Sequence, residues 1–198
     1  MREFYDKDTD LHWYMTENKS DVEKFKNINK TINNWDSPAI HQFIGDFSIA
    51  DFMTVDFPMY MVGNKPDTEH CYAYYAISDD GKPLGITDVS VVSSNPNAAT
   101  IDYLIVNPSL TNRGIGTRMI KSITHNIEWF AQNTNIEKIE AVIDERNKPS
   151  IRAVLKNNYV VSKVPSMSLR GFGYNRSKFY YTTPRVNINN NEQSEKEN

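Results

Sequence analysis

The sequence is poor in several features that define whole classes of protein, beginning with cysteine. Cys71 is the single cysteine in 198 residues, so the chain forms no internal disulfide and suits a reducing compartment. No apolar run approaches the length needed to span a bilayer. The N-terminus lacks the apolar segment of a secretory signal peptide. These absences together predict a cytoplasmic protein.

The chain also lacks an excess of basic charge. It holds 22 basic and 25 acidic residues, a formal net charge of −3, whereas a general nucleic-acid binder shows a basic face. The 4 histidines and the single cysteine have no metal-ligand spacing. The sequence therefore predicts neither a nucleic-acid partner nor a metal cofactor. Its 39% hydrophobic and 24% charged content is ordinary for a globular protein.

Apolar periodicity and turn residues indicate helices and strands in mixed order. A short first strand is expected within residues 3–15, followed by helices over 20–32 and 37–45. Residues 46–63 are apolar, aromatic and rich in methionine, which fits core packing and also fits the wall of a binding groove. Three meander strands are expected at 71–78, 84–92 and 99–106, followed by a helix at 115–133 and a strand at 136–144. A short helix at 147–158 and two closing strands at 159–164 and 178–183 come last.

These elements define the fold class. Because a helix joins the strand at 99–106 to the strand at 136–144, the two strands are expected to be parallel. The prediction is an α/β protein with a mixed central sheet, an antiparallel meander plus a parallel pair, flanked by helices. It forms a single domain over residues 1–186, with its core at 71–183. Residues 187–198 are polar, lack aromatics and are predicted to be a disordered tail.

The most informative stretch is 101–119, where a strand and a loop turn into a helix. Ile101–Val106 is an apolar run rich in β-branched residues, and Asn107-Pro108 stops it. Arg113-Gly114-Ile115-Gly116 then opens the helix. The first amides of a helix lack internal partners and glycine permits close approach, so this junction suits phosphate or pyrophosphate. On this motif alone, an unrelated nucleotide-binding protein stays an alternative.

A second motif lies further along the chain. Asn147-Lys148-Pro149-Ser150 starts a short helix, and Asn158-Tyr159 follows its end, where Asn tolerates the left-handed conformation. The two motifs and the element order resemble the GCN5-related N-acetyltransferase (GNAT) superfamily, whose members use acetyl-CoA. The resemblance covers residues 71–183. Thr111 departs from the Gln or Arg that usually begins the glycine loop of the family.

The resemblance implies direct transfer of acetyl from acetyl-CoA to a primary amine of a small molecule or a peptide. Arg118 would assist the glycine loop. The cofactor-binding residues implied are Leu104, Ile105, Val106, Asn112, Arg113, Gly114, Ile115, Gly116, Thr117, Asn147 and Ser150. In many members a Tyr seven residues after the Asn of the second motif protonates the departing thiolate, and that position is Val154. A non-catalytic CoA-binding sensor or interaction module of the same fold therefore stays an alternative.

Candidate catalytic residues follow from chemistry and position. Alternation along the strand places Asp102 on one face with Leu104 and Val106. A carboxylate there needs a partner or its pKa rises, which suits a general base. A surface Asp paired with a Lys explains it equally well, and Asp88 and Glu145 are further candidates for the base.

Two hydroxyl groups are candidates for protonating the thiolate. Ser150 and Tyr159 both lie in the second motif, although Ser150 also suits a helix cap. His125 is expected on the solvated side of its helix. The expected partners are acetyl-CoA and an amine acceptor, with no nucleic acid and no membrane, and a homodimer is left open. The acceptor has no signature in the sequence.

Overall fold

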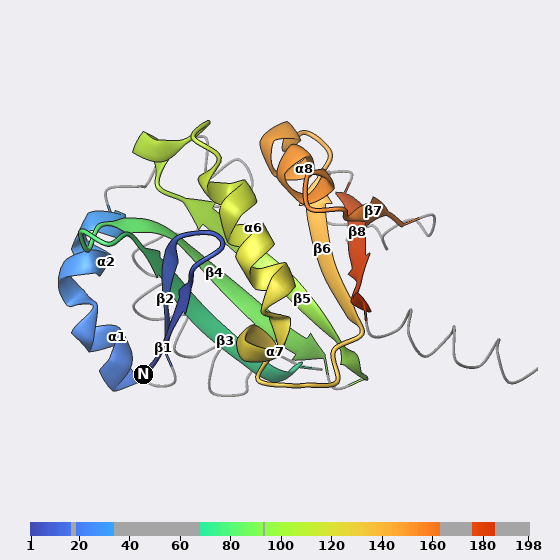
Figure 1. The fold of residues 1–198 in the computed structure, drawn as a ribbon, viewed down its shortest axis with the longest axis horizontal. Coiled ribbons are helices and arrows are strands. Elements are labelled where there is room, and N and C mark those ends of the chain that lie inside the picture. Colours follow the sequence, from blue (N-terminus) through green and yellow to red (C-terminus); the bar gives the residue numbers. More distant parts are fainter. Residues whose placement is uncertain (17–18, 34–67, 93, 163–175, 185–198) are drawn as a thin grey trace, which may run out of the picture.

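The computed structural model describes residues 1–16, 19–33, 68–92, 94–162 and 176–184. In this part of the chain the strands are β1 (Arg2–Asp6), β2 (Leu11–Thr16), β3 (Thr68–Ile77), β4 (Pro83–Val92), β5 (Asn95–Val106), β6 (Lys138–Asp144), β7 (Val160–Val161) and β8 (Arg176–Thr182). The helices are α1 (Lys19–Lys24), α2 (Lys26–Asn33), the 3₁₀ helix η2 (Pro108–Leu110), α6 (Ile115–His125), α7 (Ile127–Ala131) and α8 (Lys148–Leu155). All these strands join one sheet in the order β1-β2-β3-β4-β5-β6-β8-β7 (Figure 1).

The sheet is mixed, as the sequence predicts. Strands β1 to β5 follow chain order and pair antiparallel. β5 and β6 are parallel and are connected through α6 and α7. The last strand, β8, lies between β6 and β7 and is antiparallel to both. The predicted antiparallel meander with one parallel pair is therefore confirmed.

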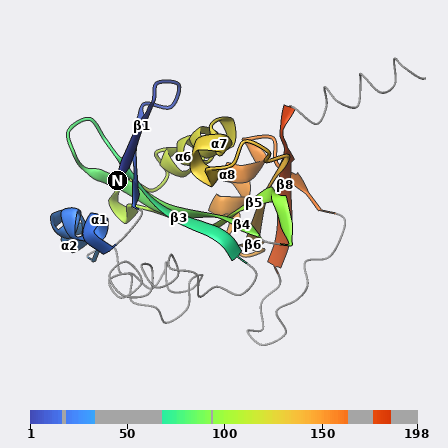
Figure 2. The same cartoon turned by 90° about the horizontal axis from the view of Figure 1, so that it is seen from below.

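The two faces of the sheet are covered by different helices. Figure 2 shows α6, α7 and α8 on one face, with α1 and α2 at the other side near β1 and β2. The helical face carries the main core, because apolar side chains of α6 and α7 meet those of the sheet. Its fully buried members include Val89, Ala99, Met119, Ile123, Phe130 and Ile139. Burial of this kind contributes roughly 1.5–3 kcal/mol for each large aliphatic or aromatic side chain.

The N-terminal region differs from the expectation of one strand and one helix. The strand expected within 3–15 is a hairpin, because Asp10 takes a left-handed φ of 52° and the Asp6 carboxylate accepts from the Thr9 hydroxyl at 2.7 Å. The helix expected over 20–32 is divided at Phe25, which is buried and stacks on Tyr75 with ring centroids 4.5 Å apart. The turn-forming residues of the hairpin were a signal that sequence reasoning missed.

Other boundaries shift without changing the order. The helix expected over 115–133 is interrupted at Asn126 into α6 and α7. The strand expected to begin at residue 99 begins earlier, at Asn95. The helix at 37–45, the patch at 46–63 and the tail at 187–198 lie outside the described residues. No helix within the described residues is long and apolar enough to cross a membrane.

Candidate functional site

The parallel strands β5 and β6 separate along their length. Their pairing joins Ala98–Ile101 to Lys138–Ala141 and goes no further, although β5 continues to Val106 and β6 to Asp144. Beyond Ile101, the backbone groups of β5 on that side are left for a partner other than β6. We call this separated part the open strand pair. Ligands in α/β proteins commonly bind beyond the carboxyl ends of parallel strands.

A β-bulge in β5 lies where the open strand pair begins. Thr87 pairs with Leu104 and Val89 with Ile101, so Asp88 alone faces two residues of β5. A bulge interrupts the alternation of side chains, and both Ile101 and Leu104 pack with the helical core. Simple alternation from Ile101 therefore does not fix the face of Asp102, and its place beside Leu104 and Val106 stays a prediction. The side chains of Asp102 and Ile105 are outside the described structure.

The glycine loop packs against the open end of β5. Asn112 and Gly114 both take left-handed φ values, 64° and 79°, which turn the chain sharply before α6. The first helical bond inside the turn runs from Arg118 N to Gly114 O at 3.0 Å. The amides of residues 115–117 therefore have no partner within the helix. A Cβ on Gly116 would lie 3.4 Å from Cγ2 of Val106, so the helix start touches the strand end.

The two arginines of this region have different roles. Arg113 is exposed in the glycine loop. Arg118 points away, and its guanidinium donates to the backbone oxygens of Thr9 and Asp10, each at 2.7 Å. Arg118 thus connects α6 to the β1–β2 turn. Nε and Nη2 of Arg118 are engaged with that turn, and the expectation that Arg118 assists the glycine loop stays a prediction.

The second motif lies beside the first. The Asn147 side chain caps α8 by accepting from the backbone N–H of Ser150 at 3.3 Å. Asn158 has the left-handed φ of 62° that the sequence predicts at the helix end. Nδ2 of Asn157 donates to the Thr117 oxygen in the first turn of α6 at 3.1 Å. Sequence reasoning missed this bond, which ties the two helices that follow β5 and β6.

Tyr159 and Ser150 differ in burial. Tyr159 is 2% exposed, and its hydroxyl lies 3.1 Å from that of Thr124 in α6. Burial raises the pKa of Tyr159 well above its usual value. Val154 is also 2% exposed in the core, whereas Ser150 is half-buried in the first turn of α8. This placement favours packing for Tyr159, while Ser150 lies in the helix that follows β6.

The remaining candidates for the base lie at different depths. Asp88 is 3% exposed and faces the bulge of β5. Glu145 is exposed just after β6 and accepts from the Ser177 hydroxyl at 2.9 Å. Both lie along the strands that border the open pair.

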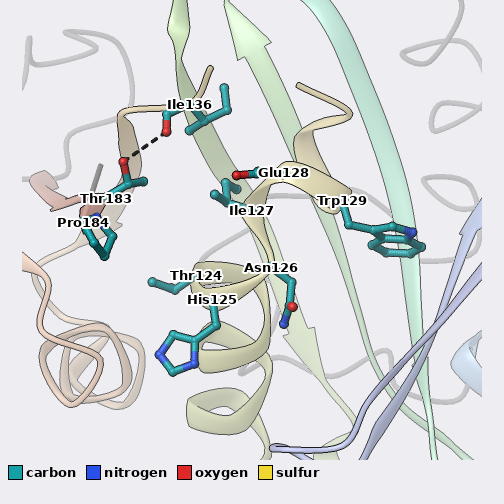
Figure 3. Close-up of a pocket in the computed structure, with 9 residues that line it drawn as sticks. All are labelled: Thr124, His125, Asn126, Ile127, Glu128, Trp129, Ile136, Thr183 and Pro184. Carbon is teal, nitrogen blue, oxygen red and sulfur yellow. Dashed lines mark hydrogen bonds between the residues drawn. The ribbon is translucent and has the colours of Figure 1, made fainter. Parts of the chain in front are cut away.

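A separate cleft of about 470 Å³ lies at the C-terminal end of α6 (Figure 3). Thr124, His125 and Ile127 line it from the helices, and Thr183 and Pro184 line it from the chain after β8. The Thr183 hydroxyl donates to the backbone oxygen of residue 136 at 3.1 Å and fixes that wall. His125 is exposed, as its position on the polar side of the helix predicts. The cleft is a helix length, roughly 15 Å, from the glycine loop, so it is not part of the site.

Comparison with known proteins agrees with this geometry. The family model described as "Acetyltransferase (GNAT) family" matches residues 39–159, more than half of the chain. The chain therefore belongs to the GNAT acetyltransferase family. No curated protein matches the sequence.

Solved structures show the same fold at low sequence identity. Aminoglycoside acetyltransferase AAC(6')-Ib, in complex with coenzyme A and kanamycin, has a TM-score of 0.61 and 16% identity, with 86% of this chain and 94% of that chain covered. Spermidine N-acetyltransferase from Vibrio cholerae, with CoA and spermine, has a TM-score of 0.56 and 12% identity, covering 86% and 95%. An acetyltransferase from Salmonella typhimurium that modifies the N-terminal serine of a ribosomal protein has a TM-score of 0.60 and 12% identity, covering 88% and 96%.

Proposed function

We propose that the protein transfers the acetyl group of acetyl-CoA directly to a primary amine of a small molecule or a peptide. The observation that carries this proposal is the open strand pair, which begins beyond Ile101 and ends against the first turn of α6. It places unpaired strand backbone next to a helix start that suits a pyrophosphate. The cytoplasmic location predicted from the sequence belongs to the same proposal.

The described residues fit the cofactor from one end to the other. The amides of residues 115–117 would bind the pyrophosphate, and the exposed Arg113 would add a charge-assisted bond. The backbone of Leu104–Val106 would hold the pantetheine arm as an added strand does, because β6 does not pair there. Asn147 and Ser150, at the start of α8, would lie near the thiol end. Acetyl-CoA supplies the acetyl thioester.

The chain then has three tasks during transfer. A backbone N–H of β5 in the open strand pair stabilises the thioester oxygen as it becomes negative. A carboxylate near the bulge removes the proton from the acceptor ammonium, since only the neutral amine attacks. Of the candidates, Asp88 faces the bulge directly. The attacking nitrogen loses its second proton as the C–S bond breaks, and the Ser150 hydroxyl, in the first turn of α8, relays that proton to the sulfur that leaves.

One observation supports a second candidate function, a non-catalytic CoA-binding module. Val154 is buried where many family members have a proton-donating Tyr, and the nearby Tyr159 hydroxyl is bonded to Thr124 in the core. Neither side chain supplies an acid to the open strand pair. The two functions share the cofactor site and differ in turnover.

Two measurements on the full-length protein separate these functions. Free-thiol release from acetyl-CoA is followed with a panel of primary amines, and thermal stability is followed with CoA and with nucleotides. Amine-dependent thiol release supports the transferase. Stabilisation by CoA without turnover on any amine supports the binding module. Stabilisation by a nucleotide and none by CoA would refute both and favour a nucleotide-binding protein.

A further inference from the structure

The acceptor meets one particular face of the sheet. In the described part of the chain, helices α6 and α8 lie over one face of the sheet (Figure 2), and an acceptor would approach the open strand pair from the opposite face. Side chains alternate along β6, and those turned toward the helices are buried. The members turned toward the acceptor face are Lys138, Glu140, Val142 and Asp144.

Three charged side chains form a compact group on this face. Nζ of Lys138 lies 2.5 Å from Oε1 of Glu140, and Nζ of Lys178 in β8 contacts Oε2 of the same carboxylate. Lys138 also lies over the Tyr180 ring, 5.3 Å from its centroid. We call Lys138, Glu140 and Lys178 the lysine pair cluster. With the carboxylate ionised, the cluster carries a net positive charge.

The cluster presents donors rather than acceptors to a ligand. Each oxygen of Glu140 accepts from one lysine, while each ammonium has three N–H groups and gives one of them to Glu140. The side chains of the two lysines are also more exposed, 41% for Lys138 and 33% for Lys178, than the side chain of Glu140, which is 13% exposed. Burial raises the pKa of Glu140, and the bonds from both lysines lower it further than burial raises it. An approaching ligand therefore meets two cations over a shielded carboxylate.

The position of the cluster sets a distance to the reacting centre. β6 leaves β5 after Ala141, so Val142 is the first residue of β6 in the open strand pair. Val142 is 40% exposed although it lies in an inner strand. Glu140 precedes it by two residues on the same face, which corresponds to about 7 Å. Lys178 stands opposite Val142 in β8, and its ammonium reaches back to Glu140, so the apolar Val142 side chain borders the positive cluster at the start of the open strand pair.

We propose that the acceptor is a primary amine that also carries an anionic group, with the anion bound by Lys138 and Lys178 and the intervening chain packed on Val142. This inference rests on the proposed acetyltransferase function and names the acceptor class. A separation of about 7 Å between amine and anion fits the spacing along the strand. A cationic acceptor such as a polyamine would instead be repelled by the cluster.

The test compares acceptors that differ in one end group. Initial rates of thiol release at saturating acetyl-CoA are measured with ω-amino acids of increasing length, and with the corresponding alkylamines and diamines. An ω-aminoalkyl phosphate series shows whether carboxylate or phosphate is preferred. We expect kcat/KM to be highest for the anionic series and to pass through a maximum at intermediate length.

Substitutions in the lysine pair cluster test whether its positive charge attracts the acceptor. Lys138→Gln and Lys178→Gln should each raise KM for the anionic acceptor by up to about fivefold, as expected for partly exposed pairs. KM for the alkylamine and kcat for both should stay unchanged. Glu140→Gln should lower KM for the anionic acceptor, because the cluster gains positive charge. Lys24→Gln is the matched control, since Lys24 pairs with Asp21 at 3.0 Å on α1, near the opposite edge of the sheet.

The outcomes distinguish this inference from the proposed function. If no amine is acetylated, the proposed function fails. If amines are acetylated and the anionic series have the same kcat/KM as the alkylamines and diamines, or the diamines are best, the anionic acceptor is refuted and the transferase stands. If Lys138→Gln, Lys178→Gln and Glu140→Gln all raise KM equally for charged and uncharged amines, the cluster only supports the sheet, and the inference is again refuted.

Discussion

Gly114 and Gly116 lie two residues apart, yet their replacement by alanine should change stability in opposite directions. Gly114 has a φ of +79°, and a Cβ added to it would meet nothing within 4 Å. An L-residue in this left-handed conformation costs about 1–2 kcal/mol. Gly114→Ala should therefore destabilise the fold through backbone strain alone, lowering Tm by roughly 2–8 °C for a domain of this size.

Gly116 lies inside the first turn of α6, where alanine is favoured. Its added Cβ would stand 3.4 Å from Val106 and 3.8 Å from Leu104, which is ordinary contact. Gly116→Ala should stabilise the protein by about 0.5–1 kcal/mol, because alanine restricts the unfolded chain. Tm should rise by roughly 1–4 °C.

Gly116→Ala should weaken the binding of CoA although it stabilises the fold. The new methyl group stands between the helix start and the end of β5, where the proposed cofactor passes. Loss of one amide bond to a charged phosphate corresponds to about 1.5–3 kcal/mol, or roughly tenfold or more in Kd. Urea unfolding and titration calorimetry with CoA measure the two quantities. A stabilised Gly116→Ala variant with unchanged CoA affinity would refute the assigned role of the loop, and a Gly114→Ala variant as stable as the parent would refute the strain argument.

Three further predictions concern the core and the charged cluster. Ser122→Ala removes the acceptor of the Trp13 indole N–H, now at 2.9 Å, and should cost about 1–3 kcal/mol in urea unfolding, because a buried donor loses its partner; an unchanged midpoint would contradict this. Tyr159→Phe should lose about 1 kcal/mol and keep full kcat, since the hydroxyl faces Thr124; a large fall in kcat would restore Tyr159 as an acid. The pKa of Glu140 lies below its ordinary 4.5, so the unfolded carboxyl takes protons first and stability should fall as pH drops through that region. Glu140→Gln should flatten this acid dependence, and an identical profile would argue against the pairing.

The helix boundaries at the two motifs could be predicted from the sequence because their signals are local. The glycine loop is expected directly before a helix, and α6 begins at Ile115 after the left-handed Gly114. The helix end at Asn158 follows the same logic. Parallel pairing of β5 and β6 follows from the helix between them. In each case a few adjacent residues determine the backbone.

Features that depend on distant partners could not be predicted. The sequence places Arg118 in the helix beside the glycine loop, but its carbonyl acceptors come from the β1–β2 turn, more than a hundred residues away. The bulge in β5 is defined by its register with β4, which the sequence of β5 alone does not determine. It changes the face on which later residues lie. Lys178 reaches Glu140 only because β8 returns beside β6. Periodicity within a single segment does not contain these relations.

The insertion of β8 between β6 and β7 has a consequence for synthesis of the chain. β6 and β7 precede β8 in the sequence, yet each pairs with β8 and not with the other. During translation, one edge of β6 therefore stays open until residues 176–182 have emerged. An unpaired strand edge can capture an extended segment from another chain. Nascent and C-terminally truncated chains should consequently depend more on chaperones than the finished protein does.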